Sequence, residues 1–130
     1  MKSFAVGPDG FIYGPQYATG DKGSVVKIHP VTGEITQLTA GFDGPISAKF
    51  NPDRTKLYVL SMPPGGRPKL DAVDLVTFAV TPLPSPRTPL VDDLTVAPDG
   101  RIFVSAYNSP ELNVIRPDGD VKTIGVGRRE

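Results

Sequence analysis

Short apolar segments separated by turns rich in glycine and proline recur along the chain, and their spacing reveals an internal repeat. A Pro-Asp turn begins at Pro8, Pro52 and Pro98, so its copies lie 44 and then 46 residues apart. Each turn separates two apolar segments, which are residues 4–6 and 11–13, 48–50 and 57–59, and 94–96 and 102–104. Proline presets φ, aspartate bonds the backbone ahead and glycine accepts a positive φ. The repeat therefore predicts a strand, a tight turn and a second strand, three times.

Each copy continues with two further segments of strand character. They are residues 25–28 and 34–38, 70–74 and 78–80, and 112–115 and 121–124, and the second pair has no glycine in its turn. Four short antiparallel strands in about 45 residues are typical of a β-propeller blade. We therefore predict an all-β chain of three four-stranded antiparallel blades, at about residues 1–42, 43–88 and 89–130. A three-stranded sandwich unit, repeated three times, is the alternative.

The composition agrees with this fold and argues against several classes of protein. Among 130 residues are 14 glycines and 15 prolines, which destabilise helix interiors, so a helix bundle is not expected. The 14 basic residues balance the 14 acidic ones, so neither a nucleic acid nor a membrane is an expected partner. The chain has no cysteine and one histidine, His29, which leaves no thiolate site and no His-rich metal site. The first residues lack the apolar core of a signal peptide, so we expect a cytoplasmic protein.

Three stretches carry a resemblance to known propellers. FAVGPDGFIYG, VVKIHPVTGEITQL and LTVAPDGRIFVSAYNSPELNVIRPDGDV resemble blades of NHL-type propellers. They are also similar to the senescence-marker-protein and gluconolactonase family, whose blades carry the same strand–PDG–strand punctuation. The resemblance covers nearly the whole chain and implies a propeller fold. Because many unrelated propellers share these motifs, it does not imply one activity.

The number of blades leads to a prediction about assembly. Propellers usually have four to eight blades, the resembled family generally has six, and this chain has three. A lone half-ring would expose an apolar face on its first blade and another on its third, which a soluble monomer tolerates poorly. We therefore predict a homodimer that forms one six-bladed ring, with the first blade of each chain against the third blade of its mate. The alternative is a piece of a longer propeller.

The resemblance also implies where a ligand would bind. In the resembled family, ligands lie at one mouth of the central channel, at the starts of inner strands and on the loops between second and third strands. The corresponding positions here give six candidate ligand-binding residues, Tyr17, Asp43, Ser47, Asp93, Tyr107 and Asn108. A small molecule or a peptide is the expected ligand.

Asp92 is the candidate metal ligand. The segment LVDDLTVAPDGRIFVSAYN resembles the gluconolactonase stretch in which a Pro-Asp-Gly aspartate binds a divalent metal, and Asp92 occupies that aspartate's position. Val91 and Asp93 depart from the family's proline and glycine, and the family's glutamate and asparagines have no clear counterpart. Oxygen ligands of this kind suit Ca²⁺, Mg²⁺ or Mn²⁺.

Both adjacent carboxylates also have a structural explanation, because they can cap loop amides or pair with Lys2 or an arginine. A lysine in the channel, such as Lys2 or Lys49, would supply the charge of a metal and would argue against one. Two functions therefore stay open. The first is a binding or scaffold module that assembles into a ring, and the second is a metal-dependent lactonohydrolase.

Overall fold

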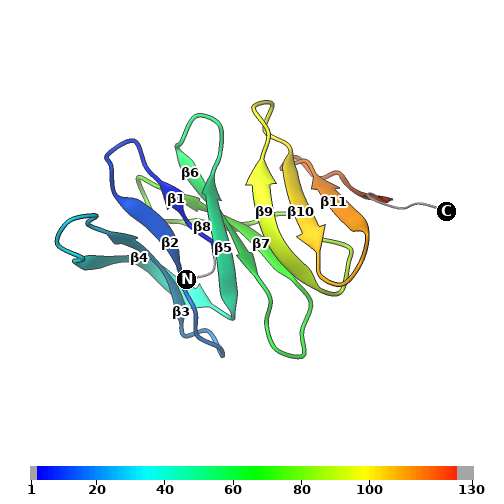
Figure 1. The fold of residues 1–130 in the computed structure, drawn as a ribbon, viewed down its shortest axis with the longest axis horizontal. Coiled ribbons are helices and arrows are strands. Elements are labelled where there is room, and N and C mark those ends of the chain that lie inside the picture. The colour runs from blue at the N-terminus through cyan, green and yellow to red at the C-terminus, as the bar shows by residue number, and fades with distance from the viewer. Residues whose placement is uncertain (1–2, 126–130) are drawn as a thin grey trace.

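Three four-stranded antiparallel sheets make up the protein (Figure 1). The computed structural model describes residues 3–125. The first sheet has strands β1 to β4, the second β5 to β8 and the third β9 to β12, each in chain order. The strands are β1 Ala5–Val6, β2 Ile12–Gln16, β3 Gly23–Ile28, β4 Ile35–Phe42, β5 Pro45–Phe50, β6 Lys56–Ser61, β7 Lys69–Asp74, β8 Val80–Pro82, β9 Val91–Val96, β10 Ile102–Ala106, β11 Glu111–Ile115 and β12 Val121–Gly125. The predicted three four-stranded antiparallel sheets are thereby confirmed.

The Pro-Asp turns form as their chemistry requires. In the first turn the Asp9 carboxylate accepts a hydrogen bond from the N–H of Phe11 at 3.1 Å, and Gly10 has a φ of 83°. Asp53 and Asp99 each accept the equivalent bond, from Thr55 and Arg101. Three equivalent aspartates therefore stabilise the turns.

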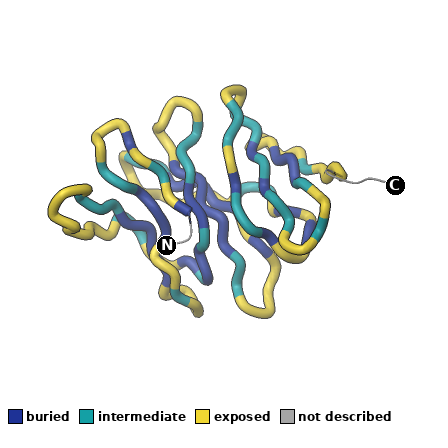
Figure 2. Tube along the Cα trace, in the orientation of Figure 1, coloured by how far each residue is buried: buried dark blue, intermediate teal, exposed yellow. Residues whose placement is uncertain are grey.

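The sheets pack face to face, and the apolar core lies in the two spaces between them (Figure 2). The core between the first and second sheets contains Tyr13, Val25, Leu57 and Val73, with the Tyr13 and Phe50 rings in edge-to-face contact at 5.1 Å. The core between the second and third sheets contains Tyr58, Leu70, Leu94, Ile102 and Ile115. The inner strands β1, β5 and β9 lie along one side of this stack.

An apolar row of four paired residues crosses each sheet at the same register. The rows are Val6, Ile12, Ile28 and Ile35 in the first sheet, Phe50, Leu57, Val73 and Val80 in the second, and Val96, Ile102, Ile115 and Val121 in the third. In the second and third sheets the row, apart from the exposed Val80, packs against the preceding sheet. In the first sheet, alternation along the strands turns it away from Tyr13 and the core. Its end residues Val6 and Ile35 are 58% and 54% exposed.

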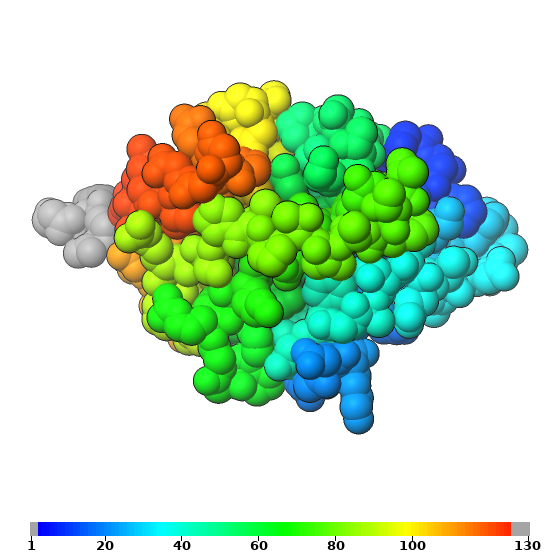
Figure 3. All heavy atoms as spheres, turned by 180° about the vertical axis from the view of Figure 1, so that it is seen from behind, coloured from blue at the N-terminus to red at the C-terminus, as the bar shows by residue number. Residues whose placement is uncertain are grey.

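A connector without strand structure, residues 83–90, joins β8 to β9 and crosses the back of the molecule (Figure 3). The fully buried side chain of Asn113 anchors it. The Asn113 amide oxygen accepts a hydrogen bond from the Arg87 N–H at 2.8 Å, and its amide nitrogen donates to the Thr88 hydroxyl at 2.9 Å and to the Val104 carbonyl at 3.1 Å. One buried amide thus ties the connector to the third sheet.

The turn between β7 and β8 differs from its two equivalents. The N–H of Gly33, Phe78 and Gly119 closes the equivalent turn in the three sheets, by donating to His29, Asp74 and Arg116 carbonyls. Phe78 has a φ of 63°, so it adopts the left-handed conformation that glycine supplies elsewhere. The missing glycine in the second copy therefore left the turn intact. Over residues 3–125, no helix has the length and hydrophobicity needed to cross a membrane.

Candidate functional site

The inner strands bring four polar side chains together. The Ser47 hydroxyl of β5 donates to Asp93 Oδ1 of β9 at 2.6 Å, and the Lys49 ammonium of β5 lies 3.7 Å from the same oxygen. Lys49 also donates to the hydroxyl of Ser3, whose backbone forms a parallel bridge to Ser47. Ser3, Ser47, Lys49 and Asp93, called here the channel network, therefore link all three inner strands.

The channel network keeps Asp93 ionised. Burial raises its pKa, but the hydrogen bonds from Ser47 and from the Leu94 N–H, together with the Lys49 charge, outweigh burial and hold the pKa below its usual value. Charge-assisted hydrogen bonds of this kind favour the carboxylate form. Asp93 therefore acts as the anion that holds two neighbouring inner strands together.

These residues do not fit a divalent metal. The Lys49 ammonium already faces the Asp93 carboxylate and supplies the positive charge there. Within residues 3–125, no three carboxylate or histidine side chains lie close enough together to hold a metal ion. Lys2, the other lysine expected near the channel, lies outside the described residues. The donor set in this part of the chain thus departs from the one that the family resemblance implied.

Asp92 faces a different space from Asp93. It lines a cavity of about 140 Å³ with Ile46, Met62, Val91 and Tyr107, called here the mouth cavity. The mouth cavity lies where β5 and β9 begin and where β6 and β10 end. Asp93 instead lines a hollow with Leu94, Ser105 and Leu112, so the two adjacent carboxylates line different spaces. The structure separates the predicted metal residue from the channel network.

The other predicted ligand-binding residues divide between several places. Tyr107 and Asn108 line a hollow of about 330 Å³ beside residues 88–90, and Tyr107 also lines the mouth cavity. Asp43 accepts a hydrogen bond from the Gly20 N–H at 2.9 Å and lines a further pocket between the first and second sheets. Tyr17 is exposed in the loop between β2 and β3. Only Ser47 and Asp93 contact one another directly.

The pocket that contains Asp43 holds residues that the sequence did not indicate. Ser61, Lys69 and Asp71 lie on strands β6 and β7, and each occupies a polar position in an otherwise ordinary strand pattern. The nearest signal was Asp71, a carboxylate inside the segment Leu70 to Val73, where strand residues are expected to be apolar. The pattern of that segment predicts a blade strand and does not indicate a pocket.

Comparison with known proteins places the fold among propellers. No protein-family model matches the chain, and no curated protein matches it either. Among solved structures, a gluconolactonase from Xanthomonas campestris is similar over 95% of this chain and 46% of its own, with a TM-score of 0.73 and 22% identity. A calcium-binding regucalcin from Agrobacterium tumefaciens is similar over 95% of this chain and 44% of its own, with a TM-score of 0.74 and 18% identity.

A virginiamycin B lyase from Staphylococcus aureus is similar over 98% of this chain and 42% of its own, with a TM-score of 0.69 and 15% identity. This chain therefore spans less than half the length of these three proteins. At such low identity the likeness concerns the fold. The three sheets of this chain correspond to propeller blades, as the resemblance to the gluconolactonase family predicted.

Proposed function

We propose that this chain is a binding module of NHL type that pairs with a second copy to close a six-bladed propeller, and that it holds a small-molecule or peptide ligand at the mouth of the channel. The observation that carries the proposal is the apolar row Val6, Ile12, Ile28 and Ile35. Apart from Val80, the residues of its two equivalents pack in the core between sheets, whereas this row faces away from the core of its own chain. A third sheet from a second copy would bury it as its equivalents are buried.

The third sheet has the matching surface. Tyr13, Tyr58 and Phe103 occupy equivalent positions beside the apolar rows, on strands β2, β6 and β10. Tyr13 contacts Phe50, the first residue of the next row, and Tyr58 packs in the same cluster as Val96, so each aromatic ring faces the sheet that carries the next row. Phe103 has no next row in its own chain, because its sheet is the third. In the proposed ring it packs on Val6 of the mate.

Strand pairing surrounds Phe103 with further apolar side chains on the same face. Val114 pairs with Phe103, and Leu112 and Ile124 follow one register step away. The same face also contains Thr95, Ser105 and Lys122, so it combines an apolar centre with polar neighbours, as specific interfaces do. The chain spans less than half of each of the three propellers described above, so two copies match the size of one such protein.

A cross-linking experiment tests the pairing. Because the chain has no cysteine, only introduced thiols react with a short bis-maleimide. A V6C chain mixed with an F103C chain is expected to give a covalent dimer, whereas V6C alone gives none because Val6 faces Phe103 of the mate. V31C, in the exposed turn after β3, replaces V6C as the matched control.

Two further readouts complete the test. T95C, beside Phe103 on the same face, repeats the cross-link without removing the ring. Light scattering on the unmodified chain is expected to give twice its 13.8 kDa mass. A concentration-independent monomer, or equal cross-linking of V6C with itself, contradicts the proposed ring.

The channel mouth is the proposed ligand site. The mouth cavity is mainly apolar, with one carboxylate, Asp92, and one phenol, Tyr107, which suits a small ligand with an apolar body. Fold likeness also favours the lactonohydrolase alternative, but the channel network does not fit the divalent metal that this chemistry would need. Millimolar Ca²⁺ is therefore expected to leave the melting temperature unchanged. A Ca²⁺-dependent rise that disappears in D92A would instead support the hydrolase.

A further inference from the structure

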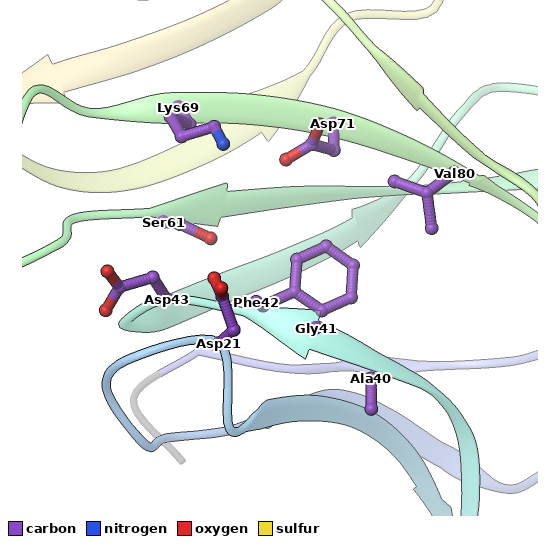
Figure 4. A pocket seen from close by; sticks show the side chains of 9 residues that line it. All are labelled: Asp21, Ala40, Gly41, Phe42, Asp43, Ser61, Lys69, Asp71 and Val80. Carbon is purple, nitrogen blue, oxygen red and sulfur yellow. The ribbon is translucent and has the colours of Figure 1, made fainter.

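A pocket of about 210 Å³ lies between the first and second sheets, where β4 and β6 end and β7 begins (Figure 4). It is separate from the channel network and the mouth cavity. Buried Phe42, Ser61 and Asp71 form its floor, and the more exposed Asp21, Asp43 and Lys69 form its rim. All six belong to one chain, so the pocket exists whether or not a second copy is bound.

Ser61 gives the first sign of a ligand. Its side chain is only 2% exposed, and its hydroxyl oxygen has no hydrogen-bond partner among residues 3–125. Figure 4 shows this oxygen directed into the space between Asp71 and Asp21. The backbone of Ser61 pairs with Pro45 and Lys69 in the sheet, so its position is fixed. A buried hydroxyl without a partner destabilises a fold by about 1–3 kcal/mol, and a bound donor would remove that cost.

Asp71 gives the second sign. It is 8% exposed, and its carboxylate accepts no hydrogen bond from the other described residues. Burial raises its pKa, and the nearby positive charge of Lys69 only partly opposes that effect. Figure 4 shows one carboxylate oxygen pointing toward Ser61. The charge of Lys69 only partly offsets the burial of Asp71, so this carboxylate on the pocket floor favours a cationic ligand.

The charges on the rim define the class of ligand. Asp21, Asp43 and Asp71 place three carboxylates around the pocket, against the single ammonium of Lys69. This excess repels anions. A divalent metal is also disfavoured, because no three carboxylates of the described chain converge closely enough to ligate one. Among the neutral and cationic ligands that remain, the excess of carboxylates favours an organic cation with hydrogen-bond donors.

We propose that this pocket binds an alkylguanidinium group. A guanidinium is planar and presents N–H donors in a fork, which matches the two oxygens of Asp71 and leaves a further donor for the Ser61 hydroxyl. The Phe42 ring in the floor adds an aromatic surface of the kind on which guanidinium groups pack. The group can belong to a small molecule or to an arginine side chain of a protein partner.

Binding of N-ethylguanidinium to the full chain, followed by NMR titration, tests the proposal. We expect saturable shifts confined to residues around the pocket, with a dissociation constant in the millimolar range. Ethylammonium should bind several-fold more weakly, and tetramethylammonium, which has no N–H, should not bind. D71N and S61A should each weaken binding, by about tenfold for D71N, because a charge-assisted hydrogen bond is lost.

Lys69 distinguishes a cation site from a site for a neutral polyol. K69Q removes a like charge and should tighten binding of ethylguanidinium, whereas it would weaken a polyol by removing a donor. D118N, in the turn between β11 and β12, removes one negative charge from the third sheet and should leave binding unchanged. An arginine peptide that binds more tightly than ethylguanidinium identifies a protein partner, and equal binding identifies a small molecule.

Two results overturn the proposal. The first is the absence of saturable shifts with ethylguanidinium at tens of millimolar. The second is binding of sorbitol together with weaker binding by K69Q, which assigns the pocket to polyols. Neither result bears on ring closure, because the cross-linking of V6C with F103C is measured without any ligand.

Discussion

At the scale of single residues, positive φ values show where the second copy has a residue other than glycine at a turn position that requires the left-handed conformation. Arg54 and Phe78 have φ values of 62° and 63°, at positions where the sister copies have glycine. The left-handed conformation costs a residue with a Cβ roughly 1–2 kcal/mol. The sister copies Gly10 and Gly100 avoid that cost, so the second copy contains local strain that the first and third do not.

Replacing Arg54 with glycine is expected to stabilise the protein. R54G removes the left-handed strain, although glycine adds some entropy to the unfolded chain, so the net gain should be about 0.5 kcal/mol. Urea unfolding measures it. The reciprocal variant G10R should lose about 1 kcal/mol or more, and equal stabilities for R54G, G10R and the unmodified chain would contradict this explanation of the turns.

Asp71 links stability to pH. Because burial raises its pKa in the folded state, the folded protein holds this proton more tightly than the unfolded chain does. Stability contributed by Asp71 is therefore complete at low pH and decreases as the pH rises from the ordinary aspartate pKa through the raised folded value. The other titratable side chains of the pocket are Asp21, Asp43 and Lys69.

D71N should abolish that decrease, since the amide has no proton to lose. We expect the melting temperature of D71N to exceed that of the unmodified chain at pH 7 and to match it near pH 3. Scanning calorimetry across this pH interval makes the measurement, and D118N provides the matched control. A D71N chain that is less stable than the unmodified chain at pH 7 would show that Asp71 has a stabilising partner.

At the scale of elements, the connector between the second and third sheets depends on one side chain. Asn113 satisfies the Arg87 N–H and the Thr88 hydroxyl, and both are attached to a segment with no strand partner of its own. Proline at positions 82, 84, 86 and 89 stiffens this segment and removes backbone donors. Because the segment is rigid and has few backbone donors, a small number of hydrogen bonds is enough to hold it against the third sheet.

Truncating Asn113 should therefore be costly. N113A leaves buried backbone and hydroxyl groups unpaired, so we expect a loss of about 2–3 kcal/mol in unfolding free energy. Q37A, an amide truncation on the exposed face of β4, is the matched control and should cost under about 0.5 kcal/mol. Similar losses in both variants would mean that the connector does not depend on the buried amide.

At the scale of the whole molecule, the three sheets form an open stack with an apolar row on one outer face and the Phe103 surface on the other. At both contacts between sheets, the aromatic-bearing face of one sheet packs against the face of the next sheet that carries the apolar row. Stacking therefore has a direction, and its two ends are complementary. This complementarity is the physical basis of the proposed closure by a second copy.

Closure by association makes stability depend on concentration. The melting temperature of the unmodified chain is expected to fall on dilution, because a binding partner stabilises the folded state by mass action. V6D places a charge on the mating face and should give a monomer whose melting temperature does not change with dilution. V31D, in an exposed turn, should behave like the unmodified chain. A dilution-independent melting temperature for the unmodified chain would contradict association.

The repeat, the all-β class and nearly all strand positions could be predicted from the sequence, because alternating apolar segments and Pro-Asp turns are local signals. The strand after the turn without a glycine was misplaced: residues 78–80 were predicted, but β8 is Val80–Pro82, because Phe78 adopts the left-handed conformation and closes the turn. The candidate site was harder to predict from the sequence. The Ser47 to Asp93 contact joins residues 46 positions apart, and no local pattern records which of two adjacent aspartates faces the neighbouring strand.

By itself, the sequence determined that this protein consists of three copies of a four-stranded unit, since each unit is encoded by its own turns and strand periods. Only the tertiary structure decided what the polar residues do. Stacking the sheets set Lys49 against Asp93, the neighbour of the candidate metal ligand Asp92, and buried Asn113 beneath the connector. It also enclosed Ser61 and Asp71 in one pocket. The reason is that hydrogen bonding and desolvation depend on neighbours that are distant in the chain, whereas turns and strand periods depend on adjacent residues.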